Sequence, residues 1–409
     1  MTVATGAQSA NARAAAIALA ITLGIQVFTS VAATAAAVLA PEIARDFALS
    51  PKLVGVFVGL VYVGSMTASL ASSGFIERYG AIRVSQACVL FCAAGVAILS
   101  LCAPGSTLGV TMLALAPLVI GIGYGPITPA SSHVLARTTP ASRMALTFSI
   151  KQTGVPLGAA LAGAALPGLA LAYGWRAAFG AVAVLGTIIA VTSQLTRASL
   201  DADREPGRTL SLASVFRPLK LVLGHAALVE LSIIGFVYAA TQVCLMSFLV
   251  VYLTEALGLS LIAAGIALTV ANVGGIVGRI GFGAIADRWI APRTMLGIIG
   301  IAAGAFAYAT AAFDASWPTV ALLTVSGFFG VTAIGWNGVQ LSEIARHAPH
   351  GQAGAVTGAT AFLTFAGVVL GPPTFAAMAS VTGSYRVGFG VFGTLSLICG
   401  CRLLFSRRK

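Results

Sequence analysis

Long apolar segments alternate with short polar segments along almost the whole chain. The segment 55–76 has 22 residues and no charge. As an α-helix it would be about 33 Å long, enough to cross a bilayer core of about 30 Å. None of the apolar segments alternates at every second residue, as the strands of a transmembrane barrel would. The pattern therefore predicts an all-α membrane protein with twelve transmembrane helices, at residues 14–40, 55–76, 84–102, 110–135, 144–171, 177–195, 226–253, 261–286, 294–313, 319–342, 353–381 and 387–405.

The composition supports this prediction. Of the 409 residues, 58% are hydrophobic and 8% are charged, and the mean hydropathy is +0.98. A soluble protein has about a quarter charged residues, so the chain is not an ordinary soluble protein. The first span resembles a secretory signal, because Arg13 precedes an apolar stretch that ends in small residues. That stretch is longer than the apolar core of a signal, so we expect an uncleaved first helix.

The basic residues fall mainly in alternate loops. With both termini in the cytoplasm, seventeen Lys and Arg residues lie in cytoplasmic segments, and four lie on the other side, namely Arg45, Lys52, Arg176 and Arg386. This bias follows the positive-inside rule and predicts a multi-pass protein of the cell inner (plasma) membrane with cytoplasmic termini. Because topology explains the net charge of +12, we expect the lipid bilayer and no nucleic acid as a partner.

An internal repeat divides the chain. The charged segments FIERYGAIRV (75–84) and AIADRWIAPR (284–293) correspond, with Glu77, Arg78 and Arg83 aligned to Asp287, Arg288 and Arg293 at an offset of 210 residues. The same offset aligns GWRAAFG (174–180) with SYRVGFG (384–390). Separated matches at one offset predict two halves of six spans each, related as a parallel repeat, with a substrate site between them.

The repeat and the polar stretch between its copies predict five parts. These are a short cytoplasmic N-terminus (1–12), an N-terminal six-helix bundle (13–195), a cytoplasmic linker (196–220), a C-terminal six-helix bundle (221–405) and a basic C-terminal tail (406–409).

The charged loop after the second span carries a family signature. Over about residues 13–405 the sequence resembles the major facilitator superfamily, whose loop motif is usually written G-x-L-x-D-R-x-G-R-R. Glu77, Arg78 and Gly80 match positions of that motif, and Ser73 takes the place of its first glycine. The resemblance implies two pseudo-symmetric six-helix bundles, the fold of that superfamily.

The second copy of the loop keeps Gly283, Asp287 and Arg288. The family resemblance implies that this loop latches the cytoplasmic ends of the two halves. A carboxylate there can accept hydrogen bonds from a helix N-terminus and can pair with arginine. We therefore predict a cytoplasmic gate formed by Glu77, Arg78, Asp287 and Arg288; the alternative is a solvated loop whose charges only set the topology.

Two basic residues lie inside predicted spans. Lys151 lies about eight residues into the fifth span, and Arg279 lies eight residues before Asp287, at a similar depth in the eighth. Charges about 11 Å deep mark substrate or ion pathways, although a long side chain can also carry its charge to the interface. The resemblance to oxalate and monocarboxylate carriers of the superfamily implies that Arg279 engages a substrate carboxylate. We expect Lys151, in the pseudo-symmetric fifth helix, to bind the same anion.

Glu230 is the only carboxylate well inside a predicted span. It is our candidate for proton coupling, because burial can make a carboxylate protonatable near neutral pH. The alternative is a structural pair with Lys220 or His225 near the start of the seventh span.

Polar and aromatic residues in spans one, four, seven and ten complete the predicted site, since these four helices line the cavity in the superfamily. For each of them the alternative is a hydrogen bond between helices. The candidates are Gln26, Tyr124, Thr128, Tyr238, Gln242, Trp336, Asn337 and Gln340.

The chain lacks a phosphate-binding glycine loop and a hydrolase nucleophile motif, so we expect no enzyme. Its six cysteines have no zinc-binding spacing, and we expect neither a metal nor a cofactor. We predict a monomeric secondary transporter that moves a small organic anion, such as a carboxylate, by alternating access, with proton coupling left open. The alternatives are a proton-linked exporter of drugs or metabolites, and a related ligand sensor that does not transport.

Overall fold

The computed structural model describes residues 2–48, 54–210, 212–314 and 316–405. Over these ranges the chain forms helices and no strand, and twelve helical stretches are long and apolar enough to cross a membrane. They coincide with the predicted spans, so the predicted helical fold is confirmed. The predicted basic tail, residues 406–409, lies outside the described residues.

The chain packs as two compact units whose boundaries differ from the two halves of the sequence. Unit 1 consists of Met1–Thr139, Gly154–His225 and Ala348–Phe362, and unit 2 consists of Pro140–Thr153, Ala226–His347 and Leu363–Lys409. The beginning of the fifth span therefore packs with the C-terminal helices. The beginning of the eleventh span packs with the N-terminal ones.

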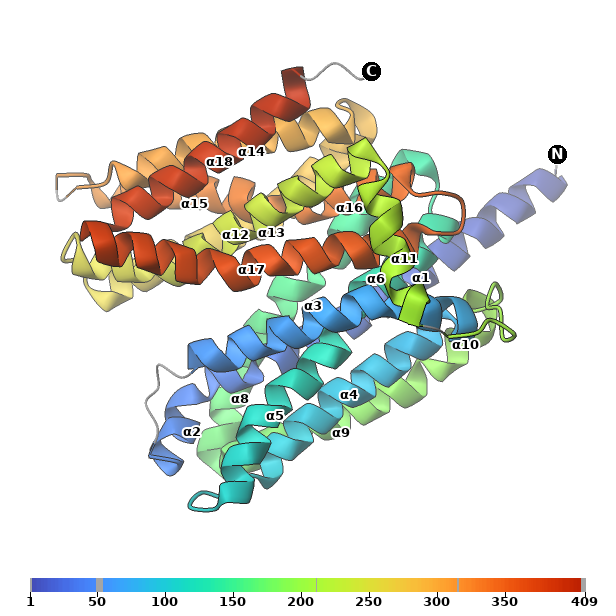
Figure 1. Cartoon of the computed structure of the whole chain (residues 1–409), viewed down its shortest axis with the longest axis horizontal. Helices are drawn as coiled ribbons and strands as arrows, with labels where there is room; N and C mark the ends of the chain where they lie inside the picture. The colour runs from blue at the N-terminus through green and yellow to red at the C-terminus, as the bar shows by residue number, and fades with distance from the viewer. Residues whose placement is uncertain (1, 49–53, 211, 315, 406–409) are drawn as a thin grey trace. The chain divides into compact units, whose positions relative to one another are not determined.

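Unit 1 is a helical bundle in which α4 lies beside α9 and α5, and α1 beside α8 (Figure 1). Its helices are α1 (Thr2–Val38), α2 (Ala40–Asp46), α3 (Val54–Tyr79), α4 (Ala81–Leu101), α5 (Thr107–Tyr124), α6 (Ile127–Thr138), α8 (Gly154–Tyr173), α9 (Trp175–Thr192), α10 (Gln194–Leu200) and α11 (Leu212–Leu223), with the first turns of α17 (Ala353–Thr382).

Unit 2 is a second bundle, in which α14 lies beside α18 and α13 beside α15. It contains the rest of α17 and the elements η2 (Ala141–Arg143), α7 (Met144–Gln152), α12 (Ala226–Glu255), α13 (Leu261–Arg288), α14 (Pro292–Ala311), α15 (Thr319–Gly335), α16 (Asn337–His347) and α18 (Tyr385–Phe405).

Helix α7 contacts both α13 and α16 within unit 2. Glycine makes this close approach possible, because a Cβ added at Gly283 or at Gly338 would overlap atoms of Ser149 on α7. At Gly338 the overlap involves main-chain atoms of Ser149, which cannot move aside as a flexible side chain can. Gly283 is also the glycine that the second copy of the loop motif retains.

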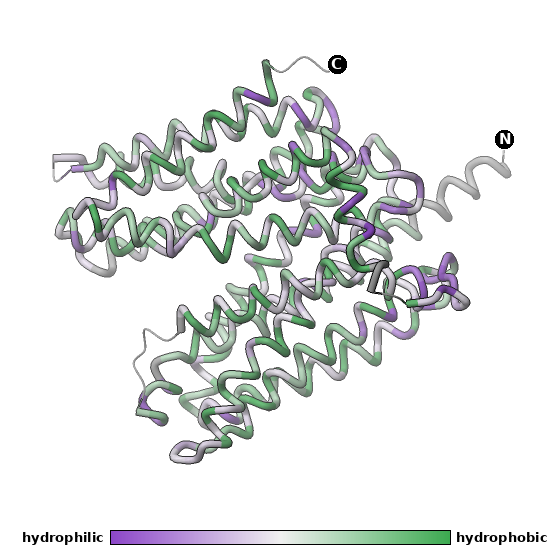
Figure 2. The backbone as a smooth tube through the Cα atoms, viewed as in Figure 1, coloured by the Kyte–Doolittle hydropathy of each residue, from purple (hydrophilic) through white to green (hydrophobic). Residues whose placement is uncertain are grey.

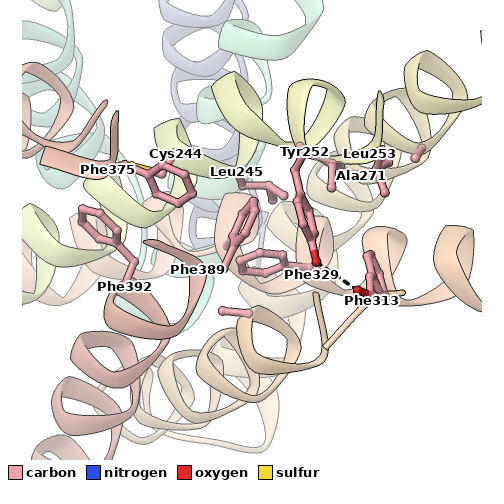
Figure 3. Packing of buried hydrophobic residues seen from close by; sticks show 14 of the residues in the cluster. Cys244, Leu245, Tyr252, Leu253, Ala271, Phe313, Phe329, Phe375, Phe389 and Phe392 are labelled. Carbon is pink, nitrogen blue, oxygen red and sulfur yellow. Dashed lines mark hydrogen bonds between the residues drawn. The ribbon is translucent and has the colours of Figure 1, made fainter. Parts of the chain in front are cut away.

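Hydrophobic residues make up most of the helices, and hydrophilic residues gather in the connections (Figure 2). In unit 2, aromatic rings from several helices interlock around Phe389 (Figure 3). The ring centroids of Phe375 and Phe389 are 5.0 Å apart in an edge-on arrangement, the geometry that aromatic pairs favour. The hydroxyl of Tyr252 donates to the main-chain oxygen of Phe313 at 3.1 Å (Figure 3), so its polar end is satisfied inside the core.

Three of the twelve spans are interrupted, which the sequence pattern did not predict. The fourth span breaks between α5 and α6 at Gly125 and Pro126, the fifth between α7 and α8 at Thr153, and the tenth between α15 and α16 at Trp336. An interruption releases main-chain carbonyl groups from the helical hydrogen-bond pattern. Each interruption adjoins a predicted site residue, namely Tyr124 in the fourth span, Lys151 in the fifth and Trp336 in the tenth.

Candidate functional site

Lys151 and Arg279 lie together in unit 2 and share Gln152 as a partner. Lys151 is in the last turn of α7, Arg279 is in α13, and each residue is 1% exposed. Lys151 Nζ donates to Gln152 Oε1 at 3.1 Å, and the Arg279 guanidinium donates to the main-chain oxygen of Gln152. Both cations are therefore buried side by side, and their burial does not fit side chains that extend to the membrane surface.

The main-chain oxygen of Gln152 can accept from Arg279 because of Pro156. In a continuous helix this oxygen would accept from the N–H of residue 156, but proline has no N–H to donate. Arg279 Nε also donates to the main-chain oxygen of Ile334 at 3.1 Å, just before α15 gives way to α16. Carbonyl groups at two helix interruptions thus hold one guanidinium group in place.

Three predicted cavity residues connect to this guanidinium. Arg279 donates to Asn337 Oδ1 at 3.4 Å. Gln242 Oε1 accepts from Trp336 Nε1 at 3.1 Å and from Asn337 Nδ2 at 3.5 Å. The chain of polar contacts therefore runs from Lys151 to Trp336, and every member belongs to unit 2. We call these residues, Lys151, Gln152, Gln242, Arg279, Trp336 and Asn337, the unit 2 polar network.

Two further predicted residues of unit 2 bond to main-chain oxygens instead. The Tyr238 hydroxyl donates to Leu296 O at 2.9 Å, and Gln340 Nε2 donates to Leu231 O at 2.8 Å. Both residues are 3% exposed. Their polar atoms thus join helices, as the alternative interpretation expected, while the Tyr238 ring packs edge-on against Trp336 at 5.7 Å.

Gln26, Tyr124 and Thr128, the remaining predicted cavity residues, belong to unit 1. Gln26 is 1% exposed and lies against Gly154, where an added Cβ would be 3.0 Å from Gln26 Cβ. Tyr124 packs edge-on against Tyr62, with ring centroids 6.4 Å apart. Gln26 and Tyr124 are buried within that bundle and Thr128 is half-buried, and the predicted role of all three in the cavity stays a prediction.

Glu230, the predicted coupling residue, binds two arginines. Its carboxylate accepts from Arg293 NH1 at 2.5 Å and from Arg402 Nε at 3.2 Å. Its side chain is 10% exposed, and that of Arg293 is 14% exposed. The geometry is that of the structural alternative, although the partners come from α14 and α18 rather than being Lys220 or His225.

Asp287, at the end of α13, caps α7. Its two carboxylate oxygens accept from the main-chain N–H groups of Ala145 at 2.9 Å and Leu146 at 2.8 Å. Arg346 NH2 lies 3.8 Å from Asp287 Oδ1. This is the contact between a loop carboxylate and a helix N-terminus that the gate hypothesis requires. Arg288 is exposed and has no ion pair among the described residues.

Glu77, the first-copy counterpart of Asp287, makes a different contact. Its carboxylate pairs with Arg208 Nε of the linker at 2.7 Å. Arg78 NH1 donates to the main-chain oxygen of Arg208 at 3.1 Å, and the Arg78 guanidinium lies over the Tyr79 ring. The two copies of the loop therefore hold different segments: Asp287 holds α7, and Glu77 holds the linker.

The linker supplies residues that the sequence interpretation missed. Asp201 is 0% exposed and caps α4, accepting from the N–H groups of Ile82 at 2.7 Å and Arg83 at 3.0 Å. Asp203 pairs with His133 at 2.7 Å and also with Arg137. Asp201 and Asp203, two of the three acidic residues in a linker with five basic ones, were the available signal, because topology alone explains only the basic residues.

The electrostatics of the linker favour a charged Asp203. Burial alone would raise its pKa, but the hydrogen bonds and charges of His133 and Arg137 outweigh burial and hold the pKa well below its usual value. Burial raises the pKa of Asp201. Among the described residues, no three His, Cys, Asp or Glu side chains are grouped so as to hold a metal ion.

Comparison with known proteins places the chain among transport proteins. The sequence model of the Major Facilitator Superfamily matches residues 22–372. A hexuronate transporter of Bacillus subtilis is 26% identical over 152 residues, which is 37% of this chain and 35% of that relative. The match thus spans about a third of the length of this curated relative.

Two solved structures share the fold across nearly the whole chain. The fucose:proton symporter of E. coli superposes with a TM-score of 0.76 at 16% identity, covering 97% of this chain and 100% of that one. The human organic anion transporter MFSD10 superposes with a TM-score of 0.76 at 14% identity, covering 94% and 98%. At such identities the likeness shows a common fold.

Proposed function

The chain belongs to the Major Facilitator Superfamily, and on that premise we propose that it is a secondary transporter that moves a small organic anion, in particular a carboxylate, by alternating access. The observation that carries the proposal is the buried pair of cations, Lys151 and Arg279, in the unit 2 polar network. Each residue is 1% exposed within a membrane-spanning segment. Charged groups at such depth are costly and are usually retained for function.

The chemistry of the unit 2 polar network suits a carboxylate. A guanidinium group offers a planar fork of donors that can grip a carboxylate with two hydrogen bonds, and an ammonium group adds a second charge. Arg279 already has a fixed orientation, because the main-chain oxygens of Gln152 and Ile334 hold it. A pre-oriented cation loses little freedom when an anion binds, which favours affinity.

The names of two similar proteins point in the same direction. One relative is named for hexuronate, a carboxylate, and one structural neighbour for organic anions. We also propose that the chain is a monomer of the inner membrane. We propose that the linker and both termini lie in the cytoplasm, and labelling of single cysteines from either side of the membrane would test this topology.

Ligand affinity in purified variants tests the proposal. We would compare Lys151→Ala, Arg279→Ala and Arg279→Lys with the native chain, using a panel of carboxylates and their neutral amides. Each charge-assisted contact contributes about 1.5–3 kcal/mol, so each alanine variant should bind a carboxylate at least about tenfold more weakly. Arg279→Lys should also be impaired, because lysine keeps the charge but loses the fork.

Arg386→Ala is the matched control, because Arg386 is a basic residue of unit 2 that bonds to Phe313 and not to the unit 2 polar network. Its carboxylate affinity should equal that of the native chain. Unchanged carboxylate affinity in both Lys151→Ala and Arg279→Ala would contradict the proposal. Tight binding of lipophilic cations would favour an exporter instead, and carboxylate binding without flux in proteoliposomes would favour a sensor.

A further inference from the structure

Gln152 joins the two buried cations of the unit 2 polar network, and the sequence interpretation did not include it in the site. Its main-chain oxygen accepts from Arg279, and its side-chain oxygen, Oε1, accepts from Lys151 Nζ at 3.1 Å. Gln152 is the last residue of α7, lies within a membrane-spanning segment and is 7% exposed. Both of its oxygens are therefore bound to cations inside the protein.

The ammonium group of Lys151 fixes which end of the Gln152 amide faces it. An ammonium group can only donate hydrogen bonds, so the amide oxygen faces Lys151 and the amide nitrogen, Nε2, faces away from it. Gln152 Nε2 has no hydrogen-bond partner among the described residues. It is also not one of their fully buried polar atoms without a partner, so part of its surface is accessible. The side chain thus offers two N–H groups to a ligand.

The other amides of the unit 2 polar network are oriented by the same rule. Arg279 and Trp336 can only donate, and they donate to Asn337 Oδ1 at 3.4 Å and to Gln242 Oε1 at 3.1 Å. Asn337 Nδ2 also donates to Gln242 Oε1, at 3.5 Å. The amide oxygens of the network are therefore engaged, while Gln242 Nε2, like Gln152 Nε2, has no partner among the described residues. Such a site suits a ligand group that accepts hydrogen bonds and donates none.

We propose that Gln152 determines specificity by donating to a second oxygen of the substrate, and that the substrate is a 2-oxo carboxylate. This inference rests on the proposed function, since Lys151 and Arg279 would bind the carboxylate group. Gln152 contacts both cations, so its N–H groups lie close to the place of that carboxylate. The oxygen on the adjacent carbon of a 2-oxo acid would lie there, and a ketone oxygen only accepts hydrogen bonds.

A 2-hydroxy acid suits the site less well. Its hydroxyl group could accept from Gln152 but must also donate, and a buried donor without a partner is costly. The amide oxygens of the network are already bound to Lys151, Arg279 and Trp336, so the hydroxyl group would have to share one of them. An unsubstituted carboxylate has no second oxygen and would leave the N–H groups of Gln152 unpaired.

Three carboxylates of equal chain length test the proposal. Pyruvate carries an oxo group beside its carboxylate, lactate carries a hydroxyl group there, and propionate carries neither. Calorimetry on the purified full chain, at constant pH and ionic strength, would measure the affinity for each. One neutral hydrogen bond changes an affinity by about two- to tenfold, so pyruvate should bind more tightly than propionate by that factor, and more tightly than lactate. Propionate or lactate binding as tightly as pyruvate would overturn the proposal.

Variants show whether Gln152 recognises the oxo group. Gln152→Met keeps the length of the side chain but has no N–H group, so the ratio of pyruvate affinity to propionate affinity should fall to about one. Gln152→Glu keeps the shape of the side chain and replaces the N–H groups with an oxygen, and it should also abolish the preference. A native ratio in either variant would overturn the proposal.

Gln86→Met is the matched control. Gln86 is a buried glutamine of unit 1 whose Nε2 already donates to Ala190 O at 2.9 Å, so this variant should keep the native ratio. The outcomes also separate this inference from the proposed function. If the native chain binds all three carboxylates equally, the oxo preference is wrong and the carboxylate site stands. If it binds none of the three, the 2-oxo acid proposal is wrong, and the wider carboxylate panel with Lys151→Ala and Arg279→Ala still decides the proposed function.

Discussion

Arg279 donates a hydrogen bond to the main-chain oxygen of Gln152, the oxygen that Pro156 leaves without its helical donor. The proline therefore acts on the site through a carbonyl group that it frees, and that carbonyl group orients a buried guanidinium. A second oxygen, from Ile334 at the next interruption, holds the same group at 3.1 Å. The interruptions in the fifth and tenth spans thus explain how a charge can be fixed inside the membrane-spanning part of the chain.

Pro156→Ala should weaken carboxylate binding while the protein still folds. Alanine restores an N–H at residue 156 that competes with Arg279 for Gln152 O. One neutral hydrogen bond contributes about 0.5–1.5 kcal/mol, so we expect roughly a two- to tenfold loss of affinity. Pro167→Ala is the control, because Pro167 is an exposed proline inside α8. Equal affinities for the native chain and Pro156→Ala would show that the freed carbonyl does not position Arg279.

Asp287→Asn should change the rate of transport more than the affinity for substrate. Asparagine offers one oxygen to the two N–H groups of Ala145 and Leu146 and carries no charge, so the cap of α7 weakens. A lost cap costs about 1 kcal/mol, enough to shift a balance between conformations several-fold. Turnover and KM in proteoliposomes would measure this effect. Arg288→Gln should leave both near the native values, since Arg288 is exposed. Native turnover in Asp287→Asn would exclude Asp287 from the gate.

Glu230→Gln should destabilise the protein and leave pH-driven uptake intact in the molecules that fold. The change breaks a largely buried pair with Arg293, and we expect a loss of about 1–3 kcal/mol in the free energy of unfolding. Arg293→Gln should cost a similar amount. Arg402→Gln should cost little, because the Arg402 side chain is 69% exposed. Thermal unfolding and uptake driven by a pH gradient are the measurements. A stable Glu230→Gln variant that has lost only the pH-driven uptake would restore the coupling role.

Much of this architecture follows from the sequence because the bilayer imposes strong constraints. A span needs a long apolar run, so all twelve could be located, and a charge within such a run is rare enough to identify Lys151 and Arg279. The partners of Glu230 were wrongly anticipated, because the nearest basic residues in sequence, Lys220 and His225, are not those that the fold brings near. Helix neighbours depend on packing between distant segments.

The internal repeat also shows that the sequence does not predict which distant segments come into contact. Glu77 and Asp287 occupy equivalent positions and have the same charge, yet one holds the linker and the other caps α7. The linker occurs once in the chain, so symmetry cannot predict its contacts. Pro156 could have suggested the interruption at Thr153, because proline lacks the N–H that a helix needs. Pro167, however, lies inside the continuous helix α8 and does not interrupt it. Proline alone therefore does not reveal where a span breaks.

Asp203→Asn should loosen the linker at neutral pH and have no effect in strong acid. Because the folded-state pKa of Asp203 is lowered, its contribution to stability is present above the ordinary aspartate pKa of about 3.9. That contribution is lost as the pH falls toward the lower folded value. The side chain is 33% exposed, so we expect a difference of about 1 kcal/mol between the native chain and the variant.

Unfolding of the two proteins at a series of pH values measures this difference. It should stay constant between about pH 5 and pH 8 and shrink below about pH 4, as the carboxylate of the native chain becomes protonated. Glu205→Gln is the matched control in the same linker, and it should change little because its side chain is 65% exposed. If the difference in the free energy of unfolding persists unchanged in strong acid, the packing of the Asp203 side chain, and not its charge, holds His133 and Arg137.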